Sequence, residues 1–309
     1  MSEPKLRVKA SGFSGSGYFQ PFTSERVIGV TTATGVLDKP ALRQWVADQT
    51  AAYAAVNAAK LLDRDEEQAF SMLRWYHSRF KSSDWDDPLK DVRDAHVGVL
   101  EDAANLGTRM HEHLEATLQG WLEPDLFRDE EVQMAEQLLI WLAENDVEVY
   151  ASEATVFGST SQGFGFGGTC DLFAKVNGVP MCLDLKTGRG MHDTHYAQLA
   201  ALSAADTMAV EVAEGTPGAI PYTSTKDGVK STTYWVPEAL PPVAAHGIIH
   251  LRPDDYDSRG RFKPAFCEMH IIDQRQIDVA WELFEASVAA RHAQRKLKDV
   301  TKMMEQEVF

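Results

Sequence analysis

The sequence predicts an α/β fold in which a helical N-terminal half packs on an α/β core. Apolar residues in the first half recur at helical spacing in alanine-rich stretches, whereas from about residue 147 they alternate as in β-strands. Asn177-Gly178, between two apolar runs, is typical of a two-residue β-hairpin loop. A long helical pattern closes the chain. We expect residues 1–90 to form an N-terminal helical region and residues 91–309 a core, joined in one structural unit.

The composition is that of an intracellular globular protein. No apolar run is long enough to span a membrane, and the polar N-terminus lacks the apolar stretch of a signal peptide. The chain has only three cysteines, which argues against a disulfide framework. It has no Cys-x-x-Cys motif, which argues against a zinc or iron–sulfur site. We therefore expect a cytoplasmic protein that does not associate with membranes.

The net charge of −16 disfavours nucleic-acid binding without excluding it, because nucleic-acid binders usually carry a basic surface. Basic residues gather in two short runs: Lys5, Arg7 and Lys9, and then Arg291, Arg295, Lys296, Lys298 and Lys302. A solvated tail and a solvated helix face explain these runs at least as well as contact with DNA.

Four helices are expected before residue 147. Asp38 is suited to cap the first of them and Pro40 to occupy its first turn. The helical patterns cover residues 38–60, 63–81, 91–121 (with an interruption near Gly107) and 129–145. Residues 1–25 look irregular, residues 27–32 predict a short strand, and residues 85–88 break the helical pattern.

The apolar period changes after residue 147. Strands are expected at residues 147–157, 248–251 and 265–272, and the hairpin at residues 169–186. Residues 158–168 and 187–194 are predicted loops, and residues 215–242 are proline-rich and predicted to be irregular. Helices are expected at residues 195–208 and 275–303.

The hairpin register brings two aspartates and a lysine to one face. With residues 177 and 178 as the loop, Asp171 lies opposite Asp184 in a non-hydrogen-bonded pair, which brings the two side chains closest. Lys186 is two residues beyond Asp184 and projects from the same face. Two opposed carboxylates repel each other unless a cation lies between them, so a metal site beside a lysine is predicted. The same register puts Cys170 and Cys182 on opposite faces as packing residues.

His111 and Glu115 are four residues apart and share one face of a predicted helix. The neighbouring apolar stripe consists of Met110, Leu114, Leu118 and Trp121. This stripe is expected to press the helix on the core, which leaves His111 at the edge of the buried face. An isolated His-x-x-x-Glu pair is more often a surface contact than a metal site, and the pattern differs from the zinc-protease His-Glu-x-x-His.

A third segment, Tyr196-Ala197-Gln198-Leu199, follows the hairpin on a predicted helix. Alone it indicates only a core tyrosine and a solvent-facing glutamine. Together, the segments give Gly-x-x-x-His-x-x-x-Glu, then Gly-x-x-Asp, then Asp-x-Lys, then Tyr-x-Gln-Leu, in that order. Over about residues 100–210 this resembles the RecB-type branch of the PD-(D/E)xK nuclease superfamily, which includes phage and CRISPR-associated exonucleases.

The resemblance implies a role for each residue of these motifs. The implied metal ligands are His111, Asp171, Asp184 and the backbone carbonyl of Leu185, with Glu115 as an acid linked to the metal directly or through another ligand. The implied catalytic set is Asp171, Asp184, Lys186 as the catalytic lysine, Gln198 to orient Lys186 or the phosphate, and Tyr196 to support the site. The implied fold is a restriction-endonuclease-like core, with a mixed central sheet flanked by helices.

The implied activity is Mg²⁺- or Mn²⁺-dependent hydrolysis of DNA by an exonuclease of phage or bacterial recombination, repair or replication. Carboxylate and imidazole ligands suit these ions. Family members with an iron–sulfur cluster carry four cysteines around the core, which this chain lacks. DNA is the implied partner, and a recombination or single-strand-binding protein and an oligomeric assembly stay open.

Two other functions stay open beside this one. A catalytically silent DNA-binding or scaffold protein has no reason to keep two repelling carboxylates. A metal-dependent hydrolase of small phosphate esters would suit the acidic composition, but the ordered motifs disfavour it.

Overall fold

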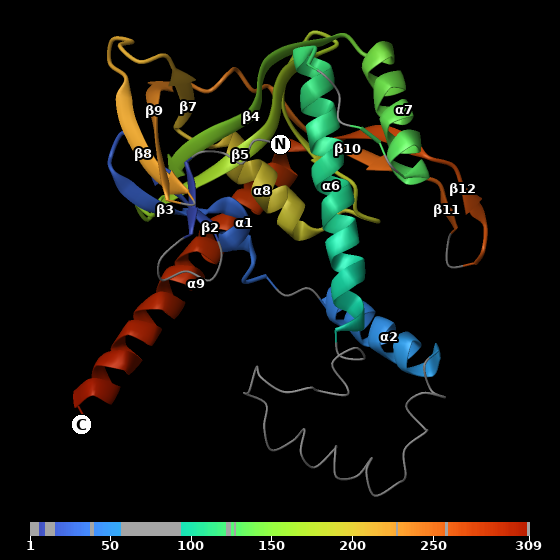
Figure 1. Cartoon of the computed structure of the whole chain (residues 1–309), viewed down its shortest axis with the longest axis horizontal. Coiled ribbons are helices and arrows are strands. Elements are labelled where there is room, and N and C mark those ends of the chain that lie inside the picture. Colours follow the sequence, from blue (N-terminus) through green and yellow to red (C-terminus); the bar gives the residue numbers. More distant parts are fainter. Residues whose placement is uncertain are drawn as a thin grey trace, which may run out of the picture. The chain divides into compact units, whose positions relative to one another are not determined.

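The computed structural model describes residues 6–9, 16–37, 40–56, 94–121, 125–126, 128–226, 228–256 and 259–307 (Figure 1). The chain divides into two units, Met1–Leu37 with Leu106–Phe309, and Asp38–Asn105. The second unit contains α2 (Pro40–Val56) and the first turns of α6 (Ala95–Gln119). Every residue of the candidate site lies in the first unit.

A mixed sheet forms the centre of the first unit, with 11 strands among the described residues. One path through the sheet has the order β1-β2-β3-β5-β4-β7-β9-β8, and β6 joins β5 to β10 and β13. The pairs β3–β5 and β6–β10 are parallel, and the other pairs are antiparallel. The strands of this sheet are β1 (Arg7–Lys9), β2 (Ser16–Gln20), β3 (Glu25–Gly29), β4 (Val147–Ser159), β5 (Gly165–Val176), β6 (Val179–Lys186), β7 (Thr207–Val212), β8 (Ile220–Lys226), β9 (Val229–Glu238), β10 (Ala245–Arg252) and β13 (Phe266–Ile272).

Helices bury apolar side chains on both faces of this sheet. The remaining elements of the first unit are α1 (Val30–Thr34), α7 (Asp129–Glu144), α8 (Asp193–Ser203), α9 (Gln274–Glu307) and a two-stranded ribbon of β11 (Asp255–Tyr256) and β12 (Phe262–Lys263). The first core cluster joins α1, α8 and α9 to the sheet, and the second joins α6 and α7 to it. In β6, Cys182 belongs to the first cluster and Leu183 to the second, as the alternation of a pleated strand requires.

The closing helix α9 packs on the sheet through one apolar stripe. In α9, Ile277, Ala280, Phe284 and Val288 are buried at intervals of three or four residues, which forms one apolar stripe. Burying each large apolar side chain of such a stripe contributes about 1.5–3 kcal/mol. The predicted closing helix is confirmed, and so are the helix at α7, the strands β4, β10 and β13, and the hairpin β5–β6.

Several element predictions were wrong. Residues 16–20 form β2 in place of an irregular segment, and β4 and β5 extend into the predicted loop 158–168. The short strand predicted at residues 27–32 is confirmed as β3, but its last three residues belong to α1. Residues 215–242, predicted to be irregular because they are rich in proline, contain the hairpin β8–β9. Strand β8 lies at the edge of the sheet, where a proline such as Pro221 is tolerated. The helix predicted at 63–81 lies outside the described residues.

Helix α6 also departs from its prediction at two points. It runs without interruption through Gly107, where a Cβ atom would lie 3.2 Å from Thr187 Oγ1 in the loop after β6. Trp121 is 60% exposed and does not continue the buried stripe, because the helix ends at Gln119 and Gly120 adopts a left-handed φ of 66°. In the described part of the chain, no helix is long and apolar enough to cross a membrane.

Candidate metal and active site

The predicted hairpin register is confirmed from the loop to the pair Leu172–Leu183, but the predicted Asp171–Asp184 pair is not part of the ladder. Asn177 and Gly178 have φ values of 49° and 84°, as a type I′ loop requires at both positions. The β5–β6 ladder pairs Val176 with Val179 and continues to Leu172 with Leu183. It ends one step before Asp171 and Asp184, so the two aspartates lie where the strands begin to separate.

Asp171 lies in a gap along one edge of β5. On this edge β3 pairs with residues 166–167 and β6 with residues 172–176, which leaves residues 168–171 without a strand partner there. The Asp171 carboxylate fills part of the gap, since its Oδ2 accepts a hydrogen bond from the Leu185 backbone N–H at 2.7 Å. The N–H and C=O of one strand residue leave the strand on the same side, so the Leu185 carbonyl faces the same gap.

The alternation of β4 and β5 reverses at the level of Asp171. In β5, Cys170 and Phe173 both belong to the first core cluster, although they are three residues apart. In β4, Ala151 and Ala154 both pack with that cluster, and between them Glu153 has a left-handed φ of 48°. A reversal in both strands at one level is a β-bulge-like irregularity that changes the direction of the side chains.

This reversal corrects the prediction for the two cysteines. Cys170 and Cys182 do not lie on opposite faces: their Sγ atoms are 3.4 Å apart, and both side chains are fully buried in the first cluster. Burial first, and then the contact with Cys182, raises the pKa of the Cys170 thiol well above its usual value. The cysteines are packing residues, as expected, but on the same face.

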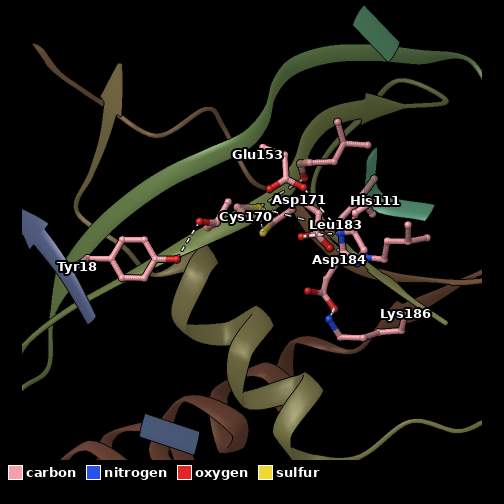
Figure 2. A network of polar contacts seen from close by, with 12 residues as sticks. Tyr18, His111, Glu153, Cys170, Asp171, Leu183, Asp184 and Lys186 are labelled. Atoms are coloured by element: carbon pink, nitrogen blue, oxygen red, sulfur yellow. Dashed lines mark hydrogen bonds and ion pairs between the residues drawn. The ribbon is translucent and has the colours of Figure 1, made fainter. Parts of the chain in front are cut away.

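Asp184 and Lys186 form a buried ion pair beside the gap (Figure 2). Lys186 Nζ lies 2.5 Å from Asp184 Oδ2, and the Asp184 side chain is only 5% exposed. Burial and the Asp171 charge raise the pKa of Asp184 to about 6, against the opposing effect of Lys186. Burial alone would lower the pKa of Lys186, but Asp184 and Asp171 outweigh it and raise that pKa, so the ammonium stays charged.

His111 reaches the same gap from α6. Its Nδ1 lies 3.4 Å from Asp171 Oδ1 and 3.8 Å from Glu153 Oε1 (Figure 2). Burial would lower the pKa of His111, but Asp171 and Glu153 outweigh it and raise the pKa to about 10. Burial would likewise raise the pKa of Asp171, but His111, Lys186 and the Leu185 N–H pull it below its usual value. Both pKa shifts arise largely from the same His111–Asp171 ion pair.

Glu153 was not predicted as a site residue. Its position in β4 falls between the register pairs Ser152–Leu172 and Ala154–Cys170, directly opposite Asp171. One ligand atom each from His111, Glu153 and Asp171 lies within 4.8 Å of the others. One imidazole and two carboxylates fit a divalent cation such as Mg²⁺ or Mn²⁺. In the sequence, Glu153 is only an acidic residue in the strand before the hairpin. Its position opposite Asp171 follows from the β4–β5 register, which the sequence does not give.

Three further predicted residues lie on α6 and α8. Glu115 is on the same side of α6 as His111, and burial together with the Glu153 charge raises its pKa. Gln198 is half-buried on α8 and makes no hydrogen bond with Lys186 in the described part of the chain. Tyr196 packs on the first cluster and lines a hollow of about 760 Å³ between α8 and the start of α9.

Glu153 has a left-handed backbone conformation, with a φ of 48°. A non-glycine residue with left-handed φ costs about 1–2 kcal/mol that glycine does not incur. We expect Glu153→Gly to be about 1 kcal/mol more stable to urea unfolding than Glu153→Ala, although glycine normally weakens a strand. Both variants should bind Mn²⁺ more weakly than the wild type. If Glu153→Ala is the more stable variant, the φ value does not represent strain.

No protein-family model matches the chain, and none of the curated proteins matches it either.

Proposed function

We propose that the protein is a Mg²⁺- or Mn²⁺-dependent deoxyribonuclease built on a restriction-endonuclease-like core. The observation that carries the proposal is the gap along β5 beside the end of the β5–β6 ladder, where His111, Glu153 and Asp171 gather next to the Asp184–Lys186 pair. Carboxylates, an imidazole and a charged lysine at one opening of a sheet suit the hydrolysis of a phosphodiester. An exonuclease of phage or bacterial recombination, repair or replication is the member of this class that the sequence motifs favour.

In the proposed mechanism, the carboxylates and the imidazole would bind the cation, and Lys186 would stabilise the phosphate. His111, Glu153, Asp171, Asp184 and the Leu185 carbonyl would hold the metal, which when bound lowers the pKa of a water and neutralises phosphate charge. Asp171 is kept in place by the Leu185 N–H, and its pKa is low enough for it to be ionised at neutral pH. The Asp171 carboxylate is therefore already deprotonated when a cation binds.

Lys186 would act as a fixed cation and not as a base. Its raised pKa keeps the ammonium protonated, and the ion pair with Asp184 holds it beside the gap. From there it would orient the attacking water or stabilise the negative charge that builds on the phosphate as the bond to the leaving oxygen breaks. The proton of the water passes to solvent or to the leaving oxygen.

The test is degradation of linear DNA by the purified protein with Mg²⁺, compared with EDTA. We expect cleavage only with Mg²⁺, and a loss of about 10²-fold in Lys186→Ala, because one charge that stabilises a transition state is worth that much. Lys175→Ala is the matched control, since Lys175 is on the same hairpin but pairs with Glu148 away from the gap.

Equal cleavage by wild type and Lys186→Ala would exclude this mechanism. Absence of both cleavage and Mn²⁺ binding in the wild type would favour a silent scaffold. Closed circular DNA in a parallel reaction separates an endonuclease, which cuts it, from an exonuclease, which requires an end.

A further inference from the structure

The ribbon β11–β12 lies at the right of Figure 1. It carries two aromatic side chains that are exposed to solvent. The strands pair Asp255 with Lys263 and Tyr256 with Phe262. Tyr256 is 65% exposed and Phe262 57% exposed, and their rings meet edge to face with centroids 5.7 Å apart. Large exposed aromatic residues contribute little to the core, and these two in contact form a small apolar patch on the surface.

Three basic residues lie around β12, whereas Asp254, Asp255 and Asp257 lie around β11 in the sequence, and Asp255 is paired with Arg189 and Arg252. Arg259, Arg261 and Lys263 are exposed and lie within a few residues of the two rings, while the whole chain has a net charge of −16. Cations beside exposed aromatic rings suit a ligand with both anionic groups and flat apolar faces. A single strand of nucleic acid has phosphates and unpaired bases that match these two features.

The base of the ribbon is tied to the loop that follows Lys186. Arg252 Nη1 donates a hydrogen bond to the Thr187 carbonyl at 2.7 Å, and His250 Nε2 contacts the Gly188 carbonyl at 2.8 Å. Asp255 pairs with Arg189 at 3.1 Å. The ribbon and the end of β6 are therefore one connected structure, and a strand held by the ribbon lies next to the loop after the catalytic lysine.

We propose that the β11–β12 ribbon binds an unpaired DNA strand and holds it beside the active site. Tyr256 and Phe262 stack on bases, and Arg259, Arg261 and Lys263 contact phosphates. Because a duplex hides its base faces, the ribbon selects single-stranded DNA or a frayed end over blunt duplex. The inference rests on the proposed function for its choice of DNA, and it adds the strand form and the surface that recognises it.

The test measures binding without cleavage. A fluorescein-labelled thymidine oligonucleotide is titrated with full-length protein in EDTA, and fluorescence anisotropy gives Kd. We expect the double variant Tyr256→Ala/Phe262→Ala to bind about tenfold more weakly or worse, as base–aromatic stacking requires. Tyr256→Phe/Phe262→Tyr keeps both rings and should keep the affinity. The matched controls are Val229→Ala and Lys230→Ala on the exposed β8–β9 hairpin, which should not change Kd.

The results separate this inference from the proposed function. If the double alanine variant binds the oligonucleotide as tightly as wild type, or if wild type binds blunt duplex equally well, the ribbon does not recognise unpaired DNA. Wild type that fails to bind the oligonucleotide also overturns the inference, and a protein partner for the ribbon would then be the better explanation. Ribbon-dependent binding without Mg²⁺-dependent cleavage supports the inference and contradicts only the proposed nuclease activity.

Discussion

Asp171→Asn is expected to lower Mg²⁺-dependent DNA cleavage by about 10³-fold or more. The substitution keeps the shape of the side chain but removes the charge that pairs with His111 and that would hold the proposed cation. A catalytic metal contributes several kcal/mol, and each 1.4 kcal/mol or so is a factor of about ten in rate. The assay is the initial rate on linear DNA, and calorimetry with Mn²⁺ should show the same loss as weakened binding.

The control for this variant is Asp206→Asn. Asp206 is an exposed aspartate at the turn before β7, outside the site, and its substitution should leave both the rate and the Mn²⁺ affinity unchanged. Loss of cleavage with intact Mn²⁺ binding would mean that Asp171 is not a ligand. An unchanged rate would remove Asp171 from the active site altogether.

The metal-free protein is expected to lose stability as the pH rises from about 7 to about 9.5. The folded pKa of His111 is about 10, above its ordinary value of 6.5, so the folded state keeps a proton that the unfolded state has released. The stabilisation is fully present below about pH 6.5 and is lost as the pH rises through 10. Over this range the expected loss in the free energy of unfolding is about 3 kcal/mol.

Urea unfolding in EDTA at the two pH values measures this loss. His111→Gln serves as the comparison, since glutamine has no titrating proton and should remove most of the slope. The carboxylates add little in this window, because Asp171 has a lowered pKa and Asp184 a pKa of about 6, so both are largely ionised above pH 7. Parallel slopes in wild type and His111→Gln would show that the His111–Asp171 ion pair does not stabilise the fold.

The hairpin could be predicted from sequence because its signals are local. The Asn177-Gly178 loop requires positive φ at two positions, and once that loop is fixed the register of every following pair is fixed too. Lys186 and Asp184 follow from the same count. Helix α7 and helix α9 were predictable for the same reason, since their apolar periods are long and uninterrupted.

Strands β2 and β8 and the site residue Glu153 were not predictable in this way. Strands β2 and β8 contain glycine or proline, which weaken a strand pattern, and the hairpins β2–β3 and β8–β9 join the sheet by pairing with β5 and β7, which are farther away in the sequence. Glu153 became part of the site through the β4–β5 register and a left-handed φ at its own position. The parity of Cys170 failed at the same point, because counting along a strand assumes a regular pleat.

The sequence by itself determined the hairpin, its two aspartates and its lysine, and the histidine on the edge of a helix face, because each depends on spacing within one element. The tertiary structure decided how these elements meet. It ended the β5–β6 ladder one pair before Asp171, brought His111 and Glu153 to that opening, and tied the β11–β12 ribbon to the loop after Lys186. Contacts between elements depend on the packing of the whole sheet and its helices, and no single segment contains that information.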